Sequence, residues 1–200
     1  RTNASEHYVF RAADATQAFA EGRLYPRWSP YALGGSGAPI PGYYPPGAAY
    51  IPALLDYFVS NDTTIAVKIV YIASLCIAGT AVYALVTRRM GAAAGVVAAL
   101  LYVYSPYLSL VAPHLLGDLP GVMCLALIPA LFWGVERLLR LNRPLDMLYV
   151  ALITAALLLT DIPAAIVGWT LAAALIAWNH ADYPRWYLAL GASVLGIGLA

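Results

Sequence analysis

Acidic side chains at three places are the groups in this sequence best suited to chemistry. Glu6 precedes His7 near the start of the chain, Asp118 stands in LLGDLPG, and Asp161 stands in LLTDIPA. Both aspartates have the form Asp-x-Pro before an apolar run, which is typical of a helix N-cap with proline in the first turn. Backbone dipoles also stabilise a charged carboxylate there, which suits a general base or a metal ligand. Capping and catalysis are therefore both open interpretations.

Basic and aromatic residues near these acids are candidate substrate contacts. Arg11 and Arg27 could bind an anion, because a guanidinium group grips phosphate oxygens through two parallel contacts. A role at the membrane surface, on an amphipathic helix, explains the two arginines equally well. His7 could contact a substrate, although a Glu-His pair such as Glu6-His7 is more often solvated surface, and His114 could equally be a helix-end residue that bonds a backbone carbonyl. Tyr44 belongs to a group of loop tyrosines whose rings could lie against a sugar or at the lipid headgroups.

The composition indicates that these residues belong to a membrane protein. Hydrophobic residues make up 62% of the 200 residues and charged residues only 10%, and the mean hydropathy is +0.73. Eleven basic and ten acidic residues leave a net charge of +1, and no basic run is interleaved with aromatic residues, so no nucleic-acid partner is expected. Glycine-rich nucleotide-binding motifs are absent from the sequence, and no nucleotide cofactor is expected.

Hydropathy predicts an all-α fold, a polytopic transmembrane helix bundle. A helical pattern over residues 8–19 predicts a short amphipathic helix that stops at Glu21-Gly22. A loop rich in glycine, proline and tyrosine follows at 27–47, and the apolar segment 51–58 is too short to span a bilayer alone. Later segments approach the length of about 20 residues that a span needs; they are 65–87, 91–107, 119–139, 145–160, 162–178 and 186–200.

Two parts of the chain follow from this division. Residues 1–64 form an external loop, and residues 65–200 form about six transmembrane helices, the last of them truncated. We expect the chain to be a fragment of a longer protein, because it opens without methionine and stops inside an apolar run.

The arginines predict how the helices are oriented in the membrane. Successive loops between the predicted spans carry two arginines, none, three, none and one; these are Arg88 and Arg89, then Arg137, Arg140 and Arg143, then Arg185. Lys and Arg are retained on the cytoplasmic side of short loops. We therefore expect a multi-pass protein of the plasma or inner membrane with residues 1–60 on the non-cytoplasmic side, together with the turns that carry Asp118 and Asp161.

The sequence resembles the GT-C-type polytopic membrane glycosyltransferases and their uncharacterised bacterial relatives. The likeness rests on the first loop, which opens with an acid beside a histidine and continues through a short helix into three turn motifs. Those motifs are Pro26-Arg27-Trp28, Gly35-Ser36-Gly37-Ala38-Pro39 and Tyr44-Pro45-Pro46. Further likeness lies in SPYLSLVAPHLLGDLPG and LLLTDIPAAIVG. Ser5 stands where the family usually has a second acid before Glu6.

The resemblance implies an enzyme that moves a sugar from a polyprenyl-phosphate donor to an acceptor on the non-cytoplasmic side. Its partners would be the lipid bilayer and the polyprenyl-phosphate-linked sugar. Glu6 and Asp118 would be the catalytic residues, with Glu6 as the general base or a metal ligand. A divalent metal ion is the one cofactor considered, without an assigned ligand set. The substrate-binding residues would be His7, Arg11, Arg27, Tyr44, His114 and Asp161.

A non-catalytic function remains the alternative. A transporter or flippase for a lipid-linked saccharide, or an assembly scaffold, would use the same external cavity for binding and would need no base. In either case the loop at 27–47 could form a lid that closes over the cavity of acids.

Overall fold

The computed structural model describes residues 5–178 and 187–200. Helices make up these described residues almost entirely, and they contain no β-strand, only an isolated bridge between Ser29 and Ala38. The predicted all-α class, with apolar helices suited to a membrane bundle, is confirmed.

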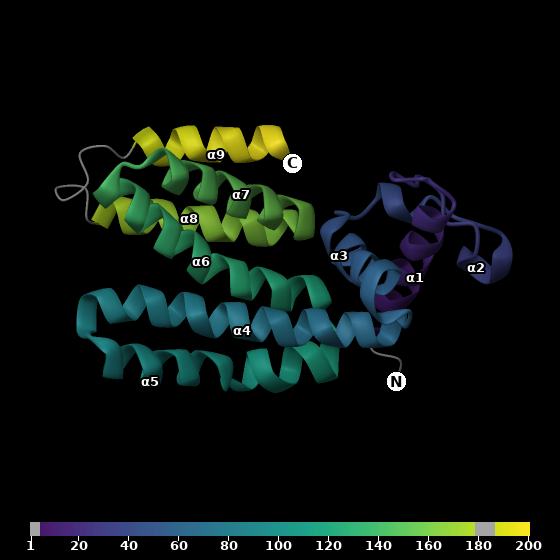
Figure 1. Ribbon diagram of the computed structural model, residues 1–200, viewed down its shortest axis with the longest axis horizontal. Coiled ribbons are helices and arrows are strands. Elements are labelled where there is room, and N and C mark those ends of the chain that lie inside the picture. Colours follow the sequence, from purple (N-terminus) through teal and green to yellow (C-terminus); the bar gives the residue numbers. More distant parts are fainter. Residues whose placement is uncertain (1–4, 179–186) are drawn as a thin grey trace.

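The first part of the chain folds into a compact group of short helices at one end of the molecule, here called the cap (Figure 1). It contains α1 (Ser5–Ala20), α2 (Ala32–Gly35), the 3₁₀ turn η1 (Ile40–Gly42), α3 (Gly47–Leu55) and the π-helical turn η2 (Asp56–Ser60). The predicted amphipathic helix corresponds to α1, and the chain leaves it at Gly22 with a φ of 76°. The predicted short apolar segment corresponds to α3 and η2.

The rest of the chain forms an elongated bundle of antiparallel helices (Figure 1). Its elements are α4 (Thr63–Met90), α5 (Ala92–Val103), the π-helical η3 (Tyr107–Leu116), α6 (Leu119–Leu141), α7 (Pro144–Thr160), α8 (Ile162–Trp178) and α9 (Tyr187–Leu199). Within residues 5–178 and 187–200, three stretches are long and apolar enough to cross a membrane; they are 63–90, 92–116 and 119–141. The last three predicted spans correspond to shorter apolar helices of 10–17 residues, at 144–160, 162–177 and 187–199.

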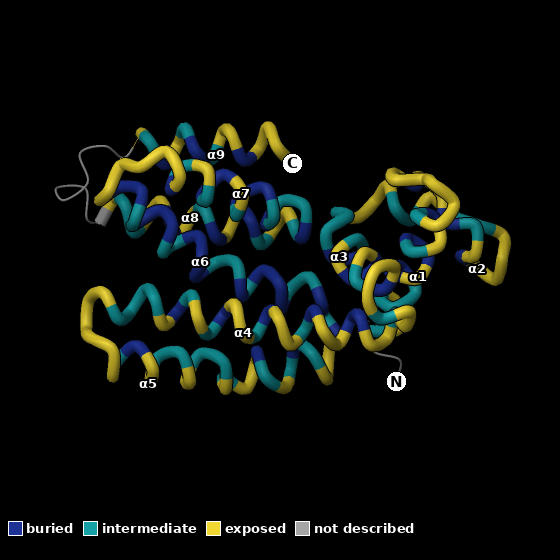
Figure 2. Tube along the Cα trace, in the orientation of Figure 1, coloured by how far each residue is buried: buried dark blue, intermediate teal, exposed yellow. Residues whose placement is uncertain are grey.

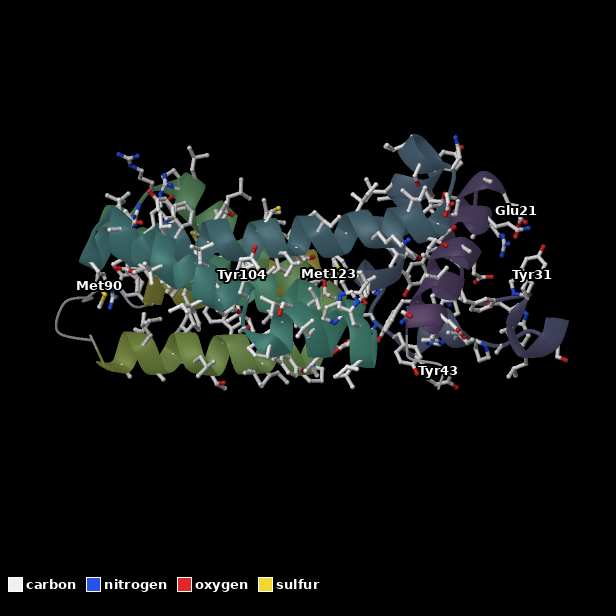
Figure 3. All side chains as sticks on the ribbon, turned by 90° about the horizontal axis from the view of Figure 1, so that it is seen from below. Glu21, Tyr31, Tyr43, Met90, Tyr104 and Met123 are labelled. Carbon is white, nitrogen blue, oxygen red and sulfur yellow. The ribbon has the colours of Figure 1, made fainter. Side chains whose placement is uncertain are left out.

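Capping residues fix where the long helices begin. Asp62 opens α4, since its carboxylate accepts hydrogen bonds from the backbone N–H groups of Thr64 at 2.8 Å and Ile65 at 3.2 Å. Because α4 starts at the cap and the helices alternate in direction, α6 also starts at the cap. The arginine-bearing ends of α4 and α6 consequently lie at the opposite end of the bundle, where Figure 3 shows Met90, while Glu21, Tyr31 and Tyr43 lie at the cap end. Arg185 lies outside the described residues.

Helix α6 is the centre of the bundle. It is the most buried of the three long helices and the stretch 92–116 is the least buried (Figure 2). The main apolar core lies between α6, α7, α8 and α9, around Leu131, Val135 and Leu157. Exposed apolar side chains on the outer faces of α4 and α5 are suited to contact with lipid.

Two buried carboxylates stabilise the end of the bundle opposite the cap. Glu136 of α6, only 1% exposed, lies 2.7 Å from Arg140 and 3.4 Å from Arg89 of α4. Asp146 of α7 lies 2.7 Å from Arg137 of α6. These ion pairs connect α6 to α4 and to α7, and they compensate the charges of the two buried carboxylates.

Polar contacts and one glycine attach the cap to the bundle. The carboxylate of buried Asp56 accepts hydrogen bonds from Thr16 of α1, at 3.1 Å, and from Thr63 at the start of α4. Gly117, between η3 and α6, lies against Ser5, so that a Cβ added there would come within 2.9 Å of the Ser5 Cβ. The orientation of α1 is therefore set from both of its ends.

Candidate functional site

The centre of the candidate site is Arg11, in the second turn of α1. Only 8% of this residue is exposed. Its guanidinium carbon lies 4.6 Å from the ring centre of Tyr44 and 5.8 Å from that of Tyr8. Nη2 donates one long hydrogen bond, 3.4 Å, to the carbonyl of Pro45. No carboxylate among the described residues forms an ion pair with Arg11, so its charge is buried without a counter-charge.

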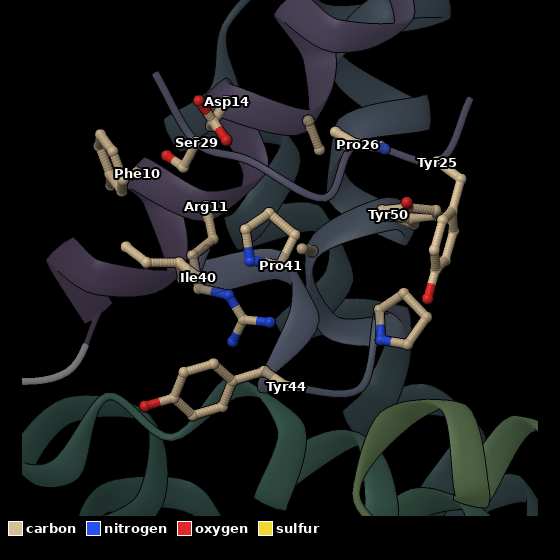
Figure 4. Close-up of a pocket in the computed structure, with 13 residues that line it drawn as sticks. Phe10, Arg11, Asp14, Tyr25, Pro26, Ser29, Ile40, Pro41, Tyr44 and Tyr50 are labelled. Atoms are coloured by element: carbon tan, nitrogen blue, oxygen red, sulfur yellow. The ribbon is translucent and has the colours of Figure 1, made fainter. Parts of the chain in front are cut away.

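The glycine- and proline-rich loop forms the roof over Arg11. The enclosed space, here called the Arg11 chamber, is lined by α1, by the loop and by α3 (Figure 4). Its loop-derived lining residues are Tyr25, Pro26, Ser29, Ile40, Pro41 and Tyr44. The chamber has a volume of about 20 Å³, which is room for roughly one water molecule. A phosphate group would therefore fit only after the roof moves.

Backbone and side-chain hydrogen bonds hold the roof in its shape. Ser29 and Ala38 exchange two backbone hydrogen bonds of 2.8 and 3.0 Å, which close the segment between them into a ring. Gln17 of α1 donates to the Tyr31 hydroxyl at 2.7 Å and anchors this ring. The loop that the sequence predicts as a lid thus lies over Arg11.

Burial alters the protonation of two cap residues beside Arg11. Partial burial, followed by the positive charge of Arg11, lowers the pKa of His7 from its ordinary value of 6.5, which favours the neutral imidazole. On the far side of the chamber burial raises the pKa of Asp14, and this is partly opposed by the Ser29 hydroxyl and Arg23. Ser29 Oγ lies beside that carboxylate without reaching full hydrogen-bond geometry. No ion pair joins Asp14 to Arg11 among the described residues.

Tyr8 links the chamber to the two Asp-x-Pro turns. Burial, followed by the negative charge of Asp118, raises the pKa of the Tyr8 hydroxyl; Arg11 opposes the rise, while Tyr44 and Asp161 add to it. Asp118 and Asp161 thus lie near the same phenol. Tyr8 did not emerge as a site residue from the sequence, although its position three residues before Arg11 places both on one face of α1.

Both aspartates also serve as helix caps. Asp118 accepts a hydrogen bond from the N–H of Gly121, and Asp161 accepts one from the N–H of Ala164, each at 3.1 Å. The capping interpretation is therefore realised at both turns, and each carboxylate keeps one oxygen for which no cap hydrogen bond is seen among the described residues.

The remaining predicted site residues lie apart from the Arg11 chamber. Glu6 is exposed on the first turn of α1, and Arg27 is exposed with its guanidinium carbon 5.9 Å from the ring centre of Tyr25. His114 lines a separate groove beside α4. His7, in contrast, contacts Tyr44 edge to face at a centre distance of 5.9 Å. The structure therefore brings together His7, Arg11 and Tyr44.

An apolar groove adjoins the chamber. It has a volume of about 390 Å³ and is lined by residues of α3, α4, α6 and α7, among them Ile51, Val70 and Met123. Pro46 and Tyr50 line both the chamber and this groove, here called the α3 groove. The chamber that contains the cationic Arg11 and the apolar α3 groove therefore lie side by side, separated by Pro46 and Tyr50. Within the described part of the chain no group of three or more His, Cys, Asp or Glu side chains is arranged to hold a metal ion.

Comparison with known proteins assigns the chain to a different family from the one that its motifs resemble. No curated protein and no solved structure matches the chain. A family model described as "6-pyruvoyl-tetrahydropterin synthase related domain; membrane protein" matches residues 42–200. Assignment to the GT-C-type glycosyltransferases was wrong, because its motifs consist of common loop residues and the match falls on this other family. The chain belongs to the 6-pyruvoyl-tetrahydropterin synthase related family of membrane proteins.

Proposed function

We propose that this membrane protein binds a lipid with a phosphate-bearing head group, with the phosphate at Arg11 and the apolar chain in the α3 groove. The observation that supports this most strongly is the buried guanidinium of Arg11, which lacks a carboxylate partner among the described residues. Burying a charge without a counter-charge is costly, and a protein tolerates it where a ligand supplies the opposite charge. A guanidinium is the side chain best suited to phosphate oxygens.

The shape of the site supports a lipid over a small soluble anion. The α3 groove is almost wholly apolar and runs beside α4, the longest apolar helix. The α3 groove shares Pro46 and Tyr50 with the chamber. The apolar chain of a lipid whose head group lies at Arg11 would therefore enter the groove without crossing a polar surface. Tyr44, stacked on Arg11, would move aside when the phosphate enters.

For the side of the membrane we propose that the cap is non-cytoplasmic. The cap lies at the end of the bundle opposite Arg88, Arg89 and the arginines that follow α6, and short arginine-bearing loops are retained in the cytoplasm. The membrane would be the cell membrane. Labelling of single cysteines placed in the cap and in the Arg88–Gly91 turn, with a reagent that does not cross the membrane, tests this: only the cap position should react in intact cells.

Transfer of a sugar from a polyprenyl-phosphate donor is the reaction we propose for such a lipid. The position of Asp118 and Asp161 near Tyr8, whose ring also lies 5.8 Å from the Arg11 guanidinium carbon, supports it, because a candidate base and the proposed phosphate site then adjoin the same side chain. Glu6 would be the alternative base. A non-catalytic carrier is supported by another observation, since both aspartates already cap helices and Glu6 is exposed. Loss of sugar transfer in D118N or E6Q, with lipid binding retained, would distinguish catalysis from carriage.

Binding of a polyprenyl monophosphate, compared with the same polyprenol lacking phosphate, tests the lipid proposal. The purified protein in nanodiscs should prefer the phosphate, and R11Q should bind it about 10- to 100-fold more weakly, as expected for a lost charged hydrogen bond. R27Q is the matched control, because Arg27 is an exposed arginine of the same cap. Equal affinity for the two lipids, or an equal loss in both variants, would refute the role of Arg11.

A further inference from the structure

A second groove lies on another face of α4 and shares no lining residue with the Arg11 chamber or the α3 groove. It has a volume of about 470 Å³ and runs between α4, η3, the start of α1 and Val122 of α6. Thr64, Lys68, Tyr71 and Leu75 form its α4 wall. Their spacing of four, three and four residues places them on one face of the helix. We call this space the Lys68 groove.

The polarity of the Lys68 groove changes along its length. Four polar residues, Ser5, Thr64, Lys68 and His114, line the end beside the cap together with Val9 and Val67. Leu75 of α4 and Leu108 of η3 line the other end with Ser109, whose hydroxyl donates to the Ser105 carbonyl at 2.9 Å. Eleven residues separate Thr64 from Leu75, which corresponds to roughly 16 Å along the helix axis at 1.5 Å per residue. This gradient matches a lipid head group followed by most of an acyl chain.

Lys68 gives the polar end a positive charge. It is the single lysine of the sequence, it is exposed, and no carboxylate among the described residues forms an ion pair with it. A cation at the head of an apolar trough complements an anion that carries a hydrocarbon chain.

We propose that the Lys68 groove holds an anionic phospholipid of the surrounding bilayer. Its phosphate lies at Lys68 and one acyl chain extends along Tyr71 toward Leu75 and Leu108. The π-helical winding of η3, which contains Pro113, shapes the wall opposite α4. Because α1 supplies Ser5 and Val9 to the head of the groove, the bound lipid also bridges the cap and the bundle.

Lipid retention measured by native mass spectrometry tests this site. The full chain, prepared in nanodiscs of phosphatidylglycerol or of phosphatidylcholine and then released into detergent, should retain one phosphatidylglycerol more strongly than phosphatidylcholine. K68Q should weaken the retention about fivefold, as expected for one cationic side chain at the lipid surface. R143Q, an exposed arginine at the other end of the bundle, controls for the change in net charge.

A second pair of variants tests the apolar end of the groove. L75W should fill the trough and lower retention, whereas C76W places the same side chain at the same depth on an adjacent, lipid-facing position and should leave it unchanged. Equal retention of the two lipids by the native chain, or equal effects within both pairs of variants, would overturn the proposal. Retention of polyprenyl phosphate in preference to phosphatidylglycerol, lost in K68Q, would also overturn the assignment to a bilayer phospholipid. R11Q should change none of these results.

Discussion

The guanidinium carbon of Arg11 lies 4.6 Å from the ring centre of Tyr44, which joins α1 to the loop that covers it. Arg11 lies in a helix and Tyr44 in an irregular loop, so no periodicity of the sequence relates the two residues. Their contact places an aromatic face over a buried positive charge, where cation–π attraction is strongest. Tyr44 thereby takes the position that a ligand anion would need, so the contact is both a structural bond and a barrier to entry.

Replacing Tyr44 should loosen the roof. In Y44L the cation–π contact is lost, and the free energy of unfolding of the cap should fall by about 1–2 kcal/mol. Limited proteolysis should cut the loop at 34–42 faster than in the native chain, and Y44F should behave like the native chain because the ring is kept. Tyr43 is 78% exposed and serves as the neighbouring control, as Y43L. Cleavage rates that are equal in Y44L and Y43L would contradict the role of the contact.

The stability of the cap should depend on His7 as the pH is lowered. The folded pKa of His7 is lower than its ordinary value of 6.5, because burial and Arg11 disfavour the charged form. The folded state therefore binds fewer protons than the unfolded state, and stability is fully present above pH 6.5 and falls as the pH decreases through the folded pKa. Thermal unfolding of the native chain and of H7Q, compared above and below pH 6.5, should show a smaller decrease in H7Q. An identical decrease in both proteins would exclude His7 as the cause.

Sequence patterns predicted those features that depend on neighbours along the chain. The amphipathic helix α1 followed from periodicity, and the caps at Asp118 and Asp161 followed from the residues that favour helix starts. The loop contributed no periodicity, so the exposure of Arg27 and the stacking of Tyr44 on Arg11 could not be inferred from spacing. The electrostatic effect of Asp118 on Tyr8 likewise depends on how the cap docks on α6.

Docking of the cap should be sensitive to a side chain at Gly117. This residue has a φ of 67°, and an added Cβ would approach the Ser5 Cβ within 2.9 Å. G117A should therefore push α1 away from η3 and destabilise the protein by about 1–3 kcal/mol, as overpacking usually does. In G42A the new methyl group meets no atom within 4 Å and the backbone needs no change, so thermal unfolding should be unaltered. Similar melting temperatures of G117A and the native chain would show that the cap is not held at this point.

The ion pairs of Glu136 at the opposite end of the bundle should contribute more to stability than an exposed pair of the cap. E136A removes the carboxylate that Arg89 and Arg140 share, and because both arginines are partly exposed the free energy of unfolding should fall by about 1.5–3 kcal/mol, as for a lost charged hydrogen bond. In the cap, Glu21 and Arg23 form an exposed pair, and E21A should cost less than about 1 kcal/mol because water screens that pair. Denaturation of both variants in the same detergent measures the difference. Since Glu136 connects α4 to α6, the loss should appear as separation of these helices, which a fluorescent pair on Cys76 of α4 and on a cysteine replacing the exposed Leu141 of α6 would detect. Unchanged transfer efficiency in a destabilised E136A would mean instead that the ion pairs stabilise α6 alone.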